Sequence, residues 1–129
     1  MTRRFSGMLV VVAALATSGL AACSGGSSKS CGAKVDSKTA TGGAVTVCAG
    51  ALSFDVNTIN ATAGALKVTF DNDGNVYHTF KIKGTSLELK ANSGKSTSGT
   101  VTLAKGTYDF ECTVPGHAAA GMKGKVVVG

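Results

Sequence analysis

The sequence predicts an all-β fold, a two-sheet sandwich or barrel of about seven to eight short strands. From Val45 onward, apolar and polar residues alternate in short runs, as expected for strands that are buried on one face. Turn signals such as Asp73-Gly74 and Lys105-Gly106 separate the runs, and no helical periodicity of ten residues interrupts them. The length of 129 residues, with 43% apolar residues, allows one such domain.

The strands are expected in the C-terminal two thirds of the chain. Their predicted ranges are Val45–Cys48, Leu52–Phe54, Thr58–Ala61, Leu66–Asn72, His78–Ile82, Ser98–Leu103, Thr107–Val114 and Lys123–Val128. A domain over residues 45–129 can bury only a modest core, so a bound metal or a disulfide would be a useful supplement to its stability.

A cluster of metal-binding side chain types lies near the C-terminus. Cys112, His117 and Met122 fall within eleven residues, and His78 lies upstream. Two His, one Cys and a weak axial Met are the ligands of blue copper centres, whereas structural zinc sites rarely use Met. Singly, each residue is more simply interpreted as part of the core. The chain after residue 22 has only these two His and this one Met, and the conjunction favours a single copper site.

Strand parity predicts that these side chains converge. Cys112 lies on the apolar, inward row of the strand Thr107–Val114, and His78 lies on the inward row of its own strand. Met122 shares the parity of the apolar row in the C-terminal strand, provided that this strand runs on without a bulge. Each of the three lies near a strand end, and His117 follows in the loop after Cys112, so one pole of a sandwich can gather all four.

The N-terminus has the features of a lipoprotein signal peptide over residues 1–22. Arg3 and Arg4 supply positive charge, an apolar run follows, and Leu20-Ala21-Ala22-Cys23 resembles the lipobox of bacterial lipoproteins. The resemblance implies lipidation of Cys23 and anchoring at the extracytoplasmic face of the bacterial cell membrane. The alternative is ordinary cleavage nearby with Cys23 free. Export by the general secretory route or by the twin-arginine route remains open.

Residues 23–44 are predicted to form a flexible linker between the anchor and the domain, because they are mostly Ser, Gly, Lys, Thr and Ala. With Cys23 lipidated and Cys112 on the metal, Cys31 and Cys48 are the remaining thiols, and exported proteins tend to pair such thiols. Pairing requires their Cα atoms to come within about 7 Å.

Charge argues against a nucleic-acid surface. Without residues 1–22 the chain has 11 Lys and 7 Asp+Glu, a net charge of +4. The lysines are dispersed and no aromatic residues are interleaved with them, so we expect no nucleic-acid partner and regard the charges as a solvated surface.

The motif Cys112-x4-His117-x4-Met122, with Val-Pro-Gly-His in the loop and Tyr-His-Thr-Phe upstream, resembles the cupredoxin family over about 54–128. Its spacing is closer to azurin-like and auracyanin-like members than to plastocyanins. The resemblance implies a cupredoxin-like Greek-key sandwich or barrel that holds one type 1 copper ion. It also implies that His78 and His117 bind through Nδ1, Cys112 through its thiolate and Met122 axially.

Three neighbours of the ligands are candidates for supporting roles. Thr79 and Thr113 each follow a ligand directly and are placed to hydrogen-bond between the two ligand loops, and Val114 N–H is placed to donate to the Cys112 sulfur. The alternative is that both threonines are outward-facing strand residues.

Small apolar residues surround His117 in the sequence. They are Pro115, Gly116, Ala118, Ala119 and Ala120. We expect the outer edge of His117 to emerge through this patch as an electron port for weakly bound redox partners. The alternative is that the alanines merely form a turn around the metal.

The expected function is that of a lipid-anchored, monomeric electron carrier that exchanges electrons with a protein donor and acceptor. The alternative is copper storage, sensing or delivery. We do not expect an enzyme, because copper oxidases and nitrite reductases need additional His-rich sites and both histidines are already used.

Overall fold

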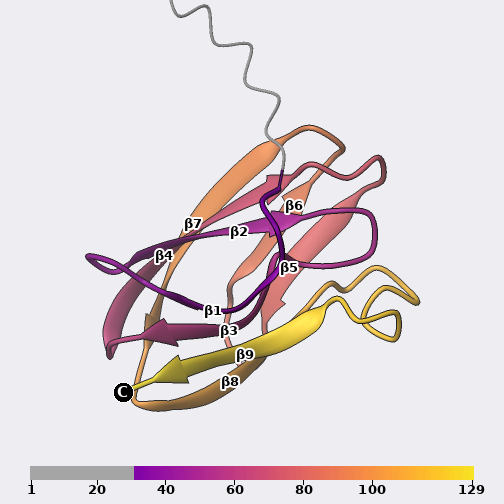
Figure 1. Ribbon diagram of the computed structural model, residues 1–129. Coiled ribbons are helices and arrows are strands. Elements are labelled where there is room, and N and C mark those ends of the chain that lie inside the picture. Colours follow the sequence, from indigo (N-terminus) through magenta and orange to yellow (C-terminus); the bar gives the residue numbers. More distant parts are fainter. Residues whose placement is uncertain (1–30) are drawn as a thin grey trace, which may run out of the picture.

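The structure is a computed structural model that describes residues 31–129, and these residues form two β-sheets packed face to face (Figure 1). The larger sheet has the order β1-β3-β9-β8-β5-β6, and the smaller sheet has the order β2-β4-β7. The strands are β1 Val35–Thr39, β2 Ala44–Ala49, β3 Val56–Ala61, β4 Gly64–Asn72, β5 His78–Ile82, β6 Glu88–Ala91, β7 Ser96–Leu103, β8 Gly106–Glu111 and β9 Lys123–Val128. The predicted all-β sandwich is confirmed, with nine strands in the described range instead of seven to eight. No helix within this range is long and apolar enough to cross a membrane.

The core lies between the sheets and is built on four phenylalanines. Phe54 makes edge contacts with Phe70, Phe80 and Phe110 at ring-centroid distances of 6.2, 5.6 and 5.5 Å, and all four rings are buried. Such ring pairs add to the free energy gained by burying their apolar area. The rings fix the spacing of the sheets below the ends of the strands that carry the site.

Strand β1 corrects the predicted boundary of the linker at residue 44. It pairs in parallel with β3 and is mostly exposed, so its sequence lacks the apolar alternation that would have revealed it. Backbone pairing, the ion pair between Lys38 and Asp55, and a disulfide just before it hold this edge strand to the body. The predicted signal peptide, Cys23 and the first part of the predicted linker lie outside the described residues.

Two further predictions about strands were wrong. Leu52–Phe54 is not a strand, since only Phe54 forms an isolated bridge, to Ala49. The four-residue strand β6, which pairs with β5, was missed because it is too short to show a clear alternation.

The ends of three strands meet at one end of the larger sheet. Strand β5 starts at His78, β8 ends one residue before Cys112, and β9 starts one residue after Met122. Because β8 lies between β5 and β9 in the sheet, these ends are neighbours. We call this end the ligand pole; the 112–122 loop lies there, in the orange-to-yellow colours of Figure 1.

Candidate metal centre

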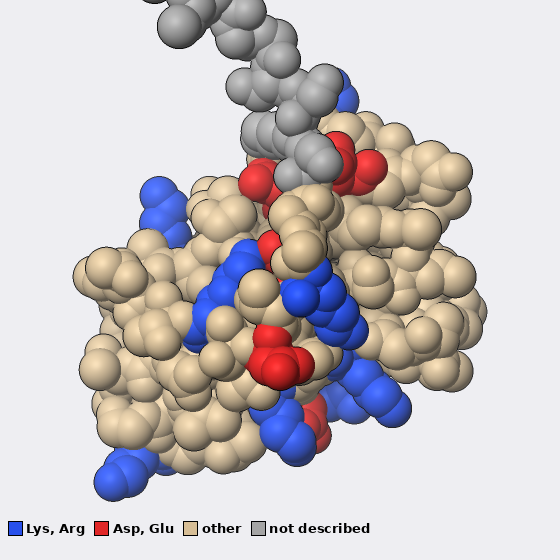
Figure 2. All heavy atoms as spheres, viewed as in Figure 1, with Lys and Arg blue, Asp and Glu red and all other residues tan. Residues whose placement is uncertain are grey.

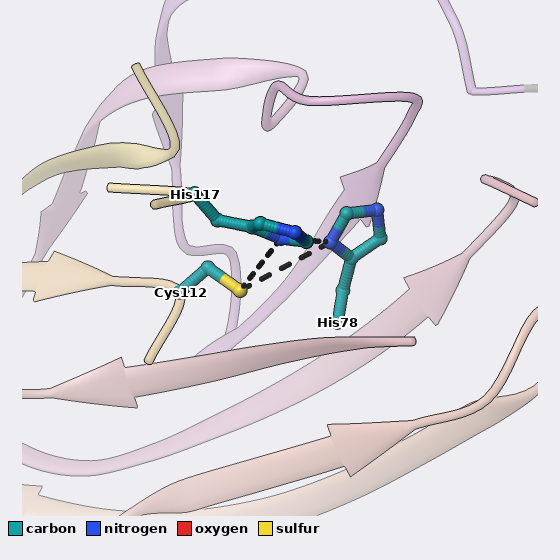
Figure 3. Close-up of side chains that lie close together, drawn as sticks. All are labelled: His78, Cys112 and His117. Atoms are coloured by element: carbon teal, nitrogen blue, oxygen red, sulfur yellow. Dashed lines mark hydrogen bonds between the residues drawn. The ribbon is translucent and has the colours of Figure 1, made fainter. Parts of the chain in front are cut away.

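The ligand pole brings one thiol and two imidazoles together, as Figure 3 shows. The Nδ1 atoms of His78 and His117 are 3.1 Å apart. The Cys112 Sγ lies 4.0 Å from the Nδ1 of His78 and 3.6 Å from the Nδ1 of His117. The predicted convergence of these three side chains, through the predicted nitrogens, is therefore present in the structure.

These separations fit a metal ion held by all three atoms. Bonds of about 2.0–2.1 Å to nitrogen and about 2.3 Å to sulfur would separate the ligand atoms by about 3.4–3.8 Å in trigonal or tetrahedral arrangements. The observed distances bracket that range. The donor set of one soft thiolate and two imidazoles suits copper.

His78 is wholly buried at the start of β5. Burial lowers its pKa below the ordinary value for histidine, and the neighbouring His117 lowers it further. The carbonyls of Gly50 and Ala51 partly offset this shift, yet Nε2 has no partner in hydrogen-bonding geometry. A metal binds the neutral imidazole, and the lowered pKa of His78 favours that form.

The loop that carries the other ligands is closed by backbone hydrogen bonds. Cys112 N–H donates to the Met122 carbonyl at 3.0 Å, and Met122 N–H donates to the His117 carbonyl at 3.1 Å. Met122 is wholly buried and shares the inward row with Val126 and Val128, as predicted from parity. The loop thus holds Cys112, His117 and Met122 in one fixed arrangement.

Thr79 ties the two ligand segments together. Its N–H donates to the Cys112 Sγ at 3.4 Å, and its hydroxyl lies 2.8 Å from that of Thr113. Thr113 N–H donates to the Thr79 Oγ1 at 2.7 Å. Thr79 is buried and Thr113 is exposed at the rim, and the two make the hydrogen bonds between ligand segments that were predicted for them.

The predicted bond from Val114 N–H to the Cys112 sulfur is not among the hydrogen bonds of residues 31–129. Thr79 N–H makes the contact with the sulfur instead. Val114 contributes its carbonyl, which accepts from His117 N–H at 3.1 Å and closes the turn around that ligand.

The residues around His117 are open to solvent to different degrees. Pro115, Gly116, Ala119 and Ala120 are exposed, and Ala118 and His117 are half-buried. His117 is therefore the one histidine of the pair that is accessible to solvent.

Sequence reasoning missed three exposed apolar side chains beside the site. They are Leu52, Val76 and Tyr77, which are 47%, 44% and 41% exposed. They belong to the loops before β3 and β5, and these loops touch at Gly50 and Gly74. Their apolar side chains in turn-rich segments were the only sequence signal of this surface, and the predicted strand Leu52–Phe54 concealed part of it.

The disulfide between Cys31 and Cys48 is present, with a Cα–Cα distance of 5.6 Å. Cys31 N–H also donates to the Asp73 carboxylate at 2.8 Å. The disulfide therefore fastens the N-terminal segment to the end of β2, and the hydrogen bond fastens it to the loop before β5.

Comparison with known proteins decides the family. A sequence model described as copper binding proteins of the plastocyanin/azurin family matches residues 41–129, more than half of the chain. The chain belongs to this family. Its site of His78, Cys112, His117 and Met122 is a type 1 copper site, and the copper cofactor predicted from the sequence is confirmed.

Solved structures agree with this assignment. Dithionite-reduced auracyanin from Roseiflexus castenholzii is 25% identical, with a TM-score of 0.63 over 70% of this chain and 98% of that one. Rusticyanin from Thiobacillus ferrooxidans is 27% identical, with a TM-score of 0.62 over 76% of this chain and 85% of that one. The cupredoxin fold predicted from the sequence is thereby confirmed.

Among curated proteins, the copper-resistant cuproprotein CopI of Rubrivivax gelatinosus is 31% identical over 100 residues. The matched segment is 60% of this chain, and the chain spans 60% of that relative's length.

Proposed function

We propose that this protein is a membrane-tethered electron carrier that exchanges single electrons with a protein donor and a protein acceptor. Copper bound at the site supplies a one-electron couple between Cu(I) and Cu(II). The observation that carries the proposal is the asymmetry of the site: its ligands are fixed in the core, and one imidazole alone reaches the surface.

The fold limits movement of the ligands. Cys112, His78 and Met122 are buried, and backbone hydrogen bonds close the loop between Cys112 and Met122. Thr79 N–H holds the sulfur from the neighbouring strand. Such support keeps a metal site in one geometry, so little has to rearrange when an electron arrives.

The surface around His117 suits brief contact with another protein. The segment 112–122 contains no charged residue. In Figure 2 the Lys, Arg, Asp and Glu side chains gather over the middle of the face, and the end where this loop lies is tan. A small apolar surface without ion pairs favours weak, quickly reversible association, as redox partners require. We place the electron port at His117, within the patch of Pro115, Gly116, Ala118, Ala119 and Ala120.

The membrane tether rests on the sequence of the N-terminus. Cys23 is the proposed lipidation site, and the disulfide at Cys31 lies eight residues after it. Eight residues extend at most about 28 Å, so a lipid at Cys23 would keep the domain close to the bilayer. The proposed location is the extracytoplasmic face of the bacterial cell membrane.

A second candidate, copper handling under copper stress, is favoured by the similarity to a copper-resistant cuproprotein. A delivery protein must release Cu(I) readily. Here only His117 among the ligands is accessible, which argues for retention of the metal. A Cu(I) chelator that strips the reduced protein within seconds would favour delivery, and slow stripping would favour the carrier.

A catalytic copper enzyme is not proposed. The chain has two histidines and both are ligands of this site, so none is left for the second copper site of an oxidase or nitrite reductase.

The test of the carrier is the visible spectrum after addition of one equivalent of Cu(II). An intense blue thiolate-to-copper band should appear and should be absent in Cys112→Ser. A colourless product, or a band that persists in Cys112→Ser, contradicts the proposal. For the tether, Cys23→Ala should move the protein from the membrane fraction to the soluble fraction, and unchanged membrane retention contradicts lipid anchoring.

A further inference from the structure

Beside the copper ligands, a chain of three side chains leads from the surface to the Cys112 sulfur. We define the hydroxyl relay as Glu88, Thr113 and Thr79. The Thr113 hydroxyl donates to the Glu88 Oε1 at 3.0 Å, and the hydroxyls of Thr113 and Thr79 are 2.8 Å apart. The Thr79 hydroxyl in turn lies 3.7 Å from the Cys112 Sγ.

Each threonine hydroxyl has a single proton, so the hydrogen bonds of the relay can run in one of two directions, from Thr79 toward Glu88 or from Thr113 toward the sulfur. A carboxylate can only accept hydrogen bonds, so the Thr113 hydroxyl is the donor to Glu88. Because the single Thr113 proton is used in that bond, the Thr113 oxygen is the acceptor in its 2.8 Å contact with Thr79, and the Thr79 hydroxyl is the donor. No hydroxyl proton is left for the sulfur at 3.7 Å.

The sulfur consequently keeps one donor, the Thr79 N–H at 3.4 Å. If the relay were reversed or cut, the Thr79 hydroxyl would be free to turn toward the sulfur and give it a second hydrogen bond. Hydrogen bonds to the copper-bound thiolate draw electron density from it, which stabilises Cu(I) relative to Cu(II) and raises the reduction potential.

We propose that Glu88 is a positioning residue that sets the direction of this relay and so holds the reduction potential of the copper site below the value that the same ligands would otherwise give. The carboxylate is anchored for this role at the edge of the larger sheet. Its residue pairs with Lys81 in the β5–β6 ladder, and the Lys81 ammonium lies 3.9 Å from its second oxygen. The inference rests on the copper site itself and holds whether the protein carries electrons or delivers copper.

The relay predicts that the two threonines affect the reduction potential of the copper site differently. Thr113→Val cuts the relay without changing charge and frees the Thr79 hydroxyl, so the potential should rise. Thr79→Val removes the hydroxyl that Thr113→Val would free, together with the oxygen that accepts from Thr113 N–H at 2.7 Å, so it provides a background in which the relay is absent. The double variant Thr79→Val with Thr113→Val should have the same potential as Thr79→Val alone, because the rise needs the freed hydroxyl.

Glu88→Ala should raise the potential through two effects, the loss of a negative charge and the loss of the relay's acceptor. In the Thr113→Val background only the charge effect remains, so the same substitution should give a smaller rise. Glu111→Gln is the matched control for charge, since it removes a carboxylate that pairs with Lys83 on the same sheet. Glu111→Gln should change the reduction potential by the same amount with and without Thr113→Val.

The experiment measures the potentials of the copper-loaded full-length variants by voltammetry, with thermal unfolding to confirm that each is folded. The Cu–S stretch in resonance Raman spectra adds a direct readout, because a hydroxyl on the sulfur makes it more sensitive to exchange into D2O. The expected results are a raised potential and increased deuterium sensitivity in Thr113→Val. An unchanged potential in Thr113→Val, a rise in potential when Thr113→Val is added to Thr79→Val, or equal effects of Glu88→Ala in both backgrounds would each overturn the proposal.

Discussion

His78 and His117 offer the same nitrogen to the same site, but the fold supports them differently. His78 starts a strand, is wholly buried, and lies against the loops that contain Gly50 and Gly74. His117 lies in a turn, is half-buried, and is held by the backbone bonds of its own loop. His78 therefore fixes the metal to the core, while His117 connects it to the surface.

The largest difference is expected when each ring is removed. His117→Gly should leave an opening that imidazole from solution can enter, so added imidazole should restore the blue band. His78→Gly should not be restored, because its cavity is closed. Large-to-small changes at buried sites also destabilise by about 2–5 kcal/mol. Absorption titrations with imidazole measure the rescue, and urea unfolding measures the stability. Equal rescue of the two variants would contradict the difference in enclosure between His78 and His117.

The next effect concerns the disulfide behind His78. Replacing Cys31 and Cys48 together by Ser should lower the free energy of unfolding by about 3 kcal/mol, the value expected for closing a loop of this size. The bridge spans 17 residues and fastens the segment before β1 to β2. Urea unfolding of the metal-free protein measures the change. A loss well below 1 kcal/mol would show that backbone pairing of β1 is sufficient by itself.

A smaller effect tests how tightly the loops enclose His78. A Cβ added at Gly74 would clash with the Gly50 carbonyl oxygen and would lie 3.1 Å from the His78 Nε2. Gly74→Ala should therefore destabilise by about 1–3 kcal/mol, as overpacking does, and should shift the blue band by displacing the ring. Gly32→Ala is the control, because nothing lies within 4 Å of its added Cβ. An unshifted band in Gly74→Ala would contradict tight enclosure.

Much of this site could be predicted from the sequence because its chemistry is concentrated in a few rare residues. Parity placed Cys112, His78 and Met122 on inward rows, and the counts of His and Met left few other arrangements. Elements without such a signal were missed. Strand β1 is polar and held by pairing, and β6 has only four residues.

Details of hydrogen bonding were also beyond the sequence. The donor to the sulfur is Thr79 and not Val114, because the choice depends on how two loops face each other across the sheet. Glu88 lies 24 residues before Cys112, and only the pairing of β6 with β5 brings it to Thr113.

The smallest expected effect is on the pH dependence of the metal-free protein. The pKa of His78 is lowered in the folded state. At pH values below its ordinary value of 6.5, the unfolded chain therefore binds a proton that the folded chain resists. Stability should fall as the pH falls through that range. His78→Gln should reduce this dependence when urea unfolding is followed between pH 5 and about 7.5. An identical profile in the variant would assign the dependence to other groups.

The most direct test of the central claim is repeated electrochemical reduction and oxidation of the copper-loaded protein while its blue band is recorded in the presence of a Cu(I) chelator. If His78 and its buried neighbours fix the metal and His117 only connects it to the surface, the band should disappear and return to its full intensity in every cycle. A band that weakens with each reduction, as the chelator takes copper, would contradict the account and indicate a protein that gives up its metal.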